Sequence, residues 1–316
     1  MPIITSSLGS QRPDLSDAIY QYDPAGVNFK ADEIFPPVNV NTQAGTIEVV
    51  TRESLLKLNE TLRTPGAGYN RINNYLEPLT YNCKDYGLEY AIDYGYKQTI
   101  QYNQEEGAMR AIKMGILNKR EYDAMALLLN TSTWTGAALY TDVATTWVTV
   151  ATCDPVANVI AAKKKVRDAT GVEPNAVIMS QLNFDYCLQS TLIRGSIQYT
   201  EVPTLQAVAN SLPGLFGVDK VIVPNSRYDS GGEGISTTTT TATASDSYVS
   251  VARLGVAGDV VSPSVGHTLV YDEDSGLPYV SESYWQESNR SMIYRVRHNI
   301  EMKVIDPYFA HLLKVD

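Results

Sequence analysis

The stretch GVEPNAVIMSQLNFDYCLQS, residues 171–190, has the pattern of a helix end, a short buried strand and the start of a second helix. Gly171 suits a helix C-terminus, Val177–Met179 is an apolar run, and Ser180 can cap the helix that follows. Strand ends of this kind often carry catalytic groups in α/β proteins. Here only a serine and amides follow the strand, so the stretch predicts an α/β unit without a recognisable nucleophile.

The flanking sequence extends this α/β unit. DPVANVIAAKKKVRDATG (154–171) predicts a helix with Asp154 as its cap and Gly171 as its stop. A helix over 204–212 and a strand over 219–224 follow. The run Lys163–Lys165 lies toward the helix C-terminus, where cations favour the dipole, so we interpret it as a solvated face rather than a phosphate site.

The clearest helix is QEEGAMRAIKMGILNKREYDAMALLLN, residues 104–130, whose apolar residues recur at steps of three and four. At 1.5 Å per residue it would be about 40 Å long, which is typical of a structural spine. Gly107 and Gly115 weaken it locally.

Strands are predicted on both sides of these helices. IEVVTRESLL (47–56), YGLEYAIDY (86–94) and a Thr-rich segment (141–150) have strand patterns. The stretch between the first two is polar, rich in Gly, Asn and Tyr, and too long for a hairpin turn. SMIYRVRHNIEMKVI (291–305) alternates apolar and polar residues, which predicts a half-buried antiparallel strand with His298 on its apolar face as a core or interface residue.

Two segments lack apolar anchors. Residues 1–45 are polar and rich in proline, and predict an extended arm with one helical turn near Asp14–Gln21 that is ordered by lying on something else. Residues 230–247 are of low complexity and predict a surface loop. A turn is expected at Asp272–Gly276.

Composition excludes several classes of protein. The chain has 316 residues, with 25 Lys and Arg against 35 Asp and Glu, and a formal charge of −10. This balance argues against a protein that coats nucleic acid. No apolar run is long enough for a membrane helix and the N-terminus lacks a signal pattern, so we expect a protein made without export. The 21 tyrosines against 5 phenylalanines fit either surfaces buried against a partner or ordinary strand enrichment.

No reaction class is supported by the residues. The chain has no HExxH, CxxC, GxSxG or GxxxxGK[ST] motif. Cys83, Cys153 and Cys187 are odd in number and far apart, so we expect reduced thiols. We therefore expect no catalytic residue, no cofactor, no metal and no enzymatic activity.

The order of these elements resembles the major capsid proteins of tailed phages, whose Hong Kong phage-type fold is shared with encapsulins and the herpesvirus capsid floor. The resemblance rests on the polar arm, the excursion with RTPGAGYN and YNCKDYGLEYAIDYG, the long helix, the helix–TG-x-x-PN–strand series around residue 171, and GVDKVIVPNSRY and SPSVGHTLVY. It implies an α+β capsid fold with an arm (1–44), an extended hairpin loop (45–88), a peripheral domain with the spine helix (89–150 and 263–316) and an axial α/β domain (151–262).

The resemblance also implies a function and partners. The chain would be a structural protein that self-assembles into hexamers and pentamers of an icosahedral shell enclosing double-stranded DNA, located in the virion and assembled in the host cytoplasm. A separate scaffolding protein, a portal and a decoration protein are the further partners, and no membrane is involved. The candidate inter-subunit contacts are Lys57, Arg63, Tyr69, Arg71, Tyr75 and Tyr81.

Two alternatives remain open at this stage. An encapsulin-like nanocompartment shell would have the same fold, and an α/β enzyme would require a cleft with convergent carboxylates or a Ser/His pair. Lys57 and Lys84 lie in or near the loop, but no set of residues matches the one that cross-links some relatives, so cross-linking is not expected.

Overall fold

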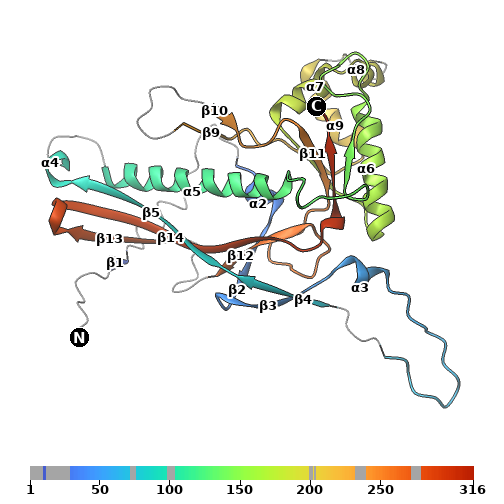
Figure 1. Ribbon diagram of the computed structural model, residues 1–316, viewed down its shortest axis with the longest axis horizontal. Coiled ribbons are helices and arrows are strands. Elements are labelled where there is room, and N and C mark those ends of the chain that lie inside the picture. The colour runs from blue at the N-terminus through green and yellow to red at the C-terminus, as the bar shows by residue number, and fades with distance from the viewer. Residues whose placement is uncertain are drawn as a thin grey trace.

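The computed structural model describes residues 10–11, 29–71, 76–97, 104–198, 202, 204–231, 240–271 and 279–316. It combines helices and two main sheets in the arrangement shown in Figure 1. The expected helical turn at Asp14–Gln21 and the expected turn at Asp272–Gly276 lie outside the described residues, as does most of the low-complexity loop.

The stretch around residue 171 contributes the strand Ala176–Met179 to the smaller sheet. This sheet has the strand order β6 (Tyr140–Asp142), β15 (Ala310–Lys314), β11 (Tyr248–Ala252), β7 (Ala176–Met179) and β8 (Lys220–Ile222). Its helices are α6 (Pro155–Thr170), α7 (Gln181–Gln189), α8 (Thr191–Ile197) and α9 (Leu205–Phe216).

The predicted helix boundaries are confirmed in this unit. The Asp154 carboxylate accepts a hydrogen bond from the amide of Ala157 at 2.9 Å, and Ser180 Oγ accepts one from the amide of Asn183 at 3.3 Å. Gly171 ends α6 with φ +74°, a left-handed conformation that favours glycine. The segment 171–190 therefore adopts the predicted helix end, strand and helix start.

All four residues of β7 are buried because both faces of the smaller sheet are covered. Val177 and Met179 pack with Val159, Cys187 and Val208 of the helices on one side. Ile178 faces the other way, into a core that also contains residues of the long helix. Each such apolar side chain contributes roughly 1.5–3 kcal/mol when fully buried.

The larger sheet is organised around one long strand. The strand order is β1 (Ser10–Gln11), β13 (Val280–Gln286), β14 (Ser291–Val304), β12 (Gly266–Tyr271) and β2 (Pro37–Val40), and β5 (Lys84–Asp93) pairs with the other edge of β14. The predicted alternation in β14 is confirmed at Tyr294, Val296 and His298, which are buried on one face.

The long helix α5 (Gln104–Leu128) lies along that face and joins the two sheets, as Figure 1 shows. Its N-terminal half packs on Tyr294 and Val296, and its C-terminal half enters the core of the smaller sheet. The helix continues through Gly107 and Gly115 without a break. A Cβ at Gly115 would lie 2.8 Å from Leu88 Cδ1, so this glycine permits the close approach of β5.

Residues 31–40 are part of the subunit's own core, contrary to the expectation of an arm that depends on a neighbour. Ile34 of α2 (Ala31–Ile34) and Phe35 have no exposed surface, and β2 pairs in parallel with β12. Glu33 bonds Lys220 at the start of β8 at 3.0 Å. The segment thus links the long helix and both sheets.

Other predicted elements differ in extent. The expected strand over 47–56 is β3 (Ala44–Val49), followed by the short helix α3 (Arg52–Leu56), and the Thr-rich strand is limited to β6. β3 pairs with β4 (Glu77–Asn82), and β9 (Arg227–Asp229) with β10 (Thr240–Ala242). The remaining elements are α4 (Tyr94–Lys97) and 3₁₀ turns at Glu287–Asn289 and Pro307–Phe309.

The smaller sheet also crosses the domain boundaries expected from the resemblance. β6 and β15 belong to it, although residues 89–150 and 263–316 were assigned to the peripheral domain. The reason is local pairing: β15 lies between β11 and β6 and hydrogen-bonds to both.

Candidate inter-subunit surface

Among the described residues, the clearest surface without a partner is the excursion formed by residues 57–71. All its residues are exposed, and Leu58 and Leu62 are 98% and 82% exposed. It has a little internal order: Arg63 Nε donates to the Ala67 carbonyl at 2.8 Å, and Asn70 Nδ2 donates to the Glu60 carbonyl at 2.9 Å. The segment that carries these two leucines projects from the body of the subunit, as Figure 1 shows.

The base of the excursion is fixed on its N-terminal side. Helix α3 contacts α6, the Arg52 amide donates to Asp306 Oδ2 at 3.0 Å, and the Arg52 guanidinium lies 3.4 Å from the centre of the Tyr308 ring. A cation over an aromatic face contributes roughly 0.5–2 kcal/mol, depending on its exposure to water. The free part of the excursion therefore begins at Lys57.

Its C-terminal side is fixed as well. The Tyr81 hydroxyl is 2.8 Å from Thr42 Oγ1, and the Asn82 amide donates to Glu301 Oε2 at 2.6 Å. These contacts hold the β3–β4 pair against the larger sheet. The subunit thus presents residues 57–71 on a base that is fixed at both ends.

The six residues expected at inter-subunit contacts fall into three groups. Lys57, Arg63, Tyr69 and Arg71 are exposed on the excursion, with the Arg63 guanidinium 4.2 Å from the centre of the Tyr69 ring. Tyr75 lies outside the described residues. Tyr81 is only 7% exposed and packs with Val38, Cys83 and Leu269, so its side chain belongs to the subunit's own core.

A second unpartnered surface, not anticipated from the sequence, lies along β5. Tyr86, Leu88, Tyr90 and Ile92 alternate with polar or small residues and share one face of the strand, but the first three are 37%, 44% and 47% exposed, and only Ile92 of these four is buried. The reason is that β5 is at the margin of the sheet, where α5 covers it only in part. The alternation of apolar and polar residues in β5 shows which side chains share the face toward α5, but it does not show how far α5 covers that face.

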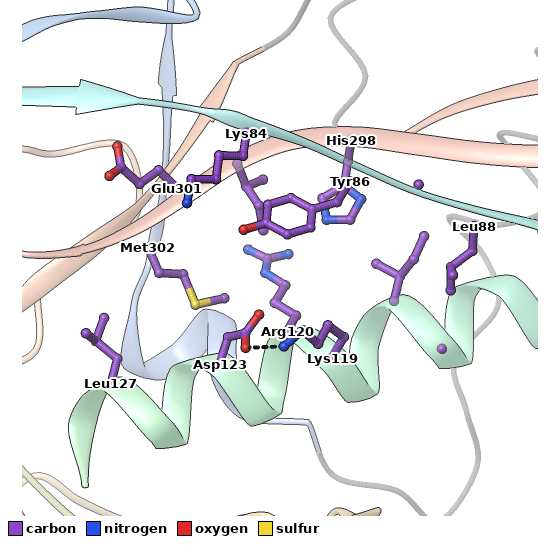
Figure 2. A pocket seen from close by; sticks show the side chains of 14 residues that line it. Lys84, Tyr86, Leu88, Lys119, Arg120, Asp123, Leu127, His298, Glu301 and Met302 are labelled. Carbon is purple, nitrogen blue, oxygen red and sulfur yellow. Dashed lines mark hydrogen bonds and ion pairs between the residues drawn. The ribbon is translucent and has the colours of Figure 1, made fainter. Parts of the chain in front are cut away.

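Between β5, β14 and α5 lies a groove of about 580 Å³, shown in Figure 2. Lys84, Tyr86 and Leu88 approach it from the strand, and Lys119 and Arg120 from the helix. Arg120 is 8% exposed and forms an ion pair with Asp32, and its Nε has no hydrogen-bond partner among the described residues. The groove combines apolar walls with cationic groups and with the carboxylates of Asp123 and Glu301.

His298 lies at the inner end of this groove and is packed between aromatic rings. Its ring is 5.7 Å from that of Tyr86 and 5.5 Å from that of Tyr279. It was expected to be a satisfied core or interface residue; it is buried, but its Nδ1 has no hydrogen-bond partner within the described ranges. Burial, with a smaller effect of the Arg120 charge, lowers the pKa of His298 to about 4, so the ring is neutral at pH 7.

Other polar groups singled out in the sequence have structural roles. Lys163 Nζ donates to the last carbonyls of α9, at Phe216 and Gly217, and Lys165 Nζ donates to Thr141 Oγ1 at 2.6 Å. Asn183 Nδ2 donates to the Asp246 carbonyl at 2.8 Å. The lysine run and the end of β7 thus hold neighbouring elements together.

The cysteines are free and buried, as expected for reduced thiols. Burial raises the pKa of Cys83 to about 11, which keeps the thiol protonated. Within the described ranges, no group of three or more His, Cys, Asp or Glu side chains is arranged to hold a metal ion. In the same part of the chain, no helix has both the length and the apolar character to cross a membrane.

These features define a fold, and comparisons with solved structures identify it. The structure of a phage-related protein from Bordetella bronchiseptica RB50 matches with a TM-score of 0.75 at 18% identity, covering 97% of this chain and 98% of that one. The capsid of cyanophage P-SCSP1u matches with a TM-score of 0.57 at 10% identity, covering 93% and 92%. The chain has the fold of tailed-phage capsid proteins, as the sequence resemblance predicted.

A sequence comparison identifies a particular relative. The major capsid protein of Burkholderia phage BcepMu is 28% identical over 152 residues, which are 48% of this chain and 49% of that protein. The match thus spans about half the length of the relative. No protein-family model matches the chain. The relative's name describes a structural protein, in agreement with the expectation that the chain is not an enzyme.

Proposed function

We propose that this protein is a phage major capsid protein, which self-assembles through hexamers and pentamers into an icosahedral shell around double-stranded DNA. The observation that carries the proposal is the capsid fold over nearly the whole chain, together with the match to a phage major capsid protein. The excursion at residues 57–71 supports it, because exposed leucines on a fixed base suit burial against another subunit.

In this proposal the subunit has four parts, the arm, the loop, the peripheral domain and the axial domain, and the loop clasps an adjacent subunit. The contacts proposed for the loop are Lys57, Arg63, Tyr69, Arg71 and Tyr75. Residues 31–40 and Tyr81 are excluded from this role because they belong to the subunit's own core. A separate scaffolding protein, a portal and a decoration protein complete the assembly in the host cytoplasm, and the product is the virion head.

The acidic composition supports a container rather than a nucleic-acid binder. A formal charge of −10 does not favour tight binding of phosphates, so packaged DNA is held by the closed shell and not by sequence-specific contacts. The encapsulin-like alternative has the same fold but less support, because the curated relative belongs to a phage.

The experiment is assembly of a double variant, Leu58→Ser with Leu62→Ser, with Ile160→Ser as the matched control. Ile160 is 53% exposed on α6, so both variants remove exposed apolar side chains and should change subunit stability by less than about 0.5 kcal/mol. The loop variant should remain a folded subunit and lose shell formation, seen by negative-stain microscopy, while the control forms shells. Normal shells from the loop variant would overturn the clasp.

A further inference from the structure

The groove between β5, β14 and α5 has the dimensions and the lining of a small-molecule site. Its volume of about 580 Å³ lies within the range of roughly 300–1,000 Å³ that is typical of such sites. Apolar side chains from all three elements line it, namely Leu88, Ile116, Leu127, Ile300 and Met302. The proposed capsid function assigns no occupant to this groove.

Tyr86 gives one wall of the groove a flat aromatic surface. Its ring stacks on the ring of His298, with the two centroids 5.7 Å apart and the planes at 24°. Tyr86 is 37% exposed, and Figure 2 shows its ring in the space between the strands and the helix. Met302 also lines the groove, and thioethers pack favourably against aromatic rings. A flat aromatic group would therefore extend the stack that His298 and Tyr86 begin.

The charged groups of the groove favour a negative charge on the ligand. Lys119 pairs with Asp123 at 2.6 Å, and Glu301 accepts a hydrogen bond from the Asn82 amide at 2.6 Å. The lining carboxylates thus have partners of their own. Lys84, by contrast, makes no ion pair among the described residues, so its ammonium group is available to an anion.

Arg120 and His298 add unsatisfied polar atoms on the inner side of the groove. Each residue is 8% exposed, and Arg120 Nε and His298 Nδ1 have no hydrogen-bond partner in the part of the chain that the structure describes. Arg120 Nη1 donates to the Tyr279 hydroxyl at 3.3 Å, which orients the guanidinium. Figure 2 shows the Arg120 side chain extending from the helix toward the rings of Tyr86 and His298. A buried donor without an acceptor is costly, so an anionic oxygen beside the guanidinium would stabilise the site.

We propose that this groove binds a flat aromatic monocarboxylate. The aromatic ring stacks on Tyr86 and contacts Met302, and the carboxylate lies between Lys84 and Arg120. A single carboxylate fits better than a phosphate ester, because two of the three lining cations already pair with aspartates of the subunit. The inference goes beyond the proposed function, because it assigns a ligand to the single subunit and does not depend on assembly.

The test is binding of naphthoate to the purified full-length protein at neutral pH, measured by isothermal titration calorimetry. We expect saturable binding, and the neutral naphthamide should bind about tenfold more weakly, because hydrogen bonds to a charged group are the stronger ones. Lys84→Gln should weaken binding about two- to fivefold, as for an exposed ion pair. Tyr86→Leu should weaken it about two- to tenfold through the lost stacking. Tyr90→Leu is the matched control and should leave binding unchanged, because Tyr90 is 47% exposed on the same face of β5 but does not line the groove.

A second measurement locates the ligand. Alkylation of the Leu88→Cys variant by iodoacetamide should slow about tenfold when naphthoate is present at about ten times its Kd, because about nine-tenths of the sites are then occupied. Leu192→Cys on α8 is the control, since Leu192 is 47% exposed and outside the groove, and its alkylation should not change. The native cysteines are buried and should not contribute. No binding, equal binding of naphthoate and naphthamide, or equal alkylation of Leu88→Cys with and without ligand would overturn the site. Tighter binding of adenosine monophosphate than of naphthoate would overturn the assignment of a carboxylate.

Discussion

Replacing Glu121 with alanine should lower the free energy of unfolding of the subunit by about 2–4 kcal/mol. Glu121 lies on α5 with no exposed surface, and its Oε2 accepts hydrogen bonds from the amides of Lys30 and Ala31 at 2.9 and 2.7 Å. The carboxylate thus satisfies the N-terminal amides of α2 from the C-terminal half of the long helix. Each buried donor left without an acceptor costs about 1–3 kcal/mol.

A loss near 2 kcal/mol, the lower end of the range for Glu121→Ala, is expected because the substitution also removes the cost of burying a carboxyl group. In the part of the chain that the structure describes, Glu121 Oε1 has no hydrogen-bond partner, so part of the desolvation of the carboxyl is uncompensated there. Glu121→Gln keeps a carbonyl oxygen for the two amides and should stay within about 1 kcal/mol of the native protein. Asp123→Ala is the matched control on the same helix, because it removes only an exposed ion pair with Lys119.

The assay is urea unfolding of the unassembled subunit. Burial raises the pKa of Glu121 above the ordinary value of 4.5, so its protonated form contributes stability that is lost as the pH rises above that value. The advantage of the native protein over Glu121→Gln should therefore decrease above pH 4.5. Equal stabilities for Glu121→Ala and Asp123→Ala would refute the idea that this carboxyl holds residues 30–35 in place.

Two further predictions concern the subunit. The pKa of His298 is lowered from 6.5 to about 4, so the folded protein favours the neutral ring. This contribution to stability is complete above pH 6.5 and is lost as the pH falls toward 4. The free energy of unfolding should decrease by at most about 3 kcal/mol over that interval. Acid unfolding followed by circular dichroism should show that His298→Phe loses less stability between pH 6.5 and 4 than the native protein does. An equal loss in the two proteins would contradict this role of His298. Gly171→Ala should lower the free energy of unfolding by about 1 kcal/mol, because the residue has φ +74°. Gly214→Ala in α9, where an added Cβ meets no atom within 4 Å, should raise it by up to about 1 kcal/mol. Thermal melts of the two variants measure both changes. A neutral Gly171→Ala would show that α6 can end without a left-handed residue.

The sequence predicted the elements whose signals are local. Caps and stops at Asp154, Gly171 and Ser180 are decided by side chains within a few residues, and the structure confirms them. The strand predicted over 47–56 was partly wrong, because Arg52–Leu56 is held as a helix by contacts with α6 and Asp306, far away in sequence. Propensity alone does not contain such contacts.

Contacts between residues that are distant in sequence also decide which side chains are exposed at the surface. The burial of Tyr81 depends on Thr42 and Leu269, and the exposure of Tyr86 and Leu88 depends on where α5 ends its cover of the sheet. The role of Glu121 as a cap is also invisible in the sequence, because its partners lie about 90 residues away.

The central claim is that this chain builds a closed shell from copies of itself. The most direct measurement is negative-stain microscopy of the purified protein, with light scattering of the same sample over a range of concentrations, with and without a co-expressed scaffold. The account predicts closed shells, or rings of the size of a hexamer. A compact monomer at every concentration and with scaffold present would contradict it.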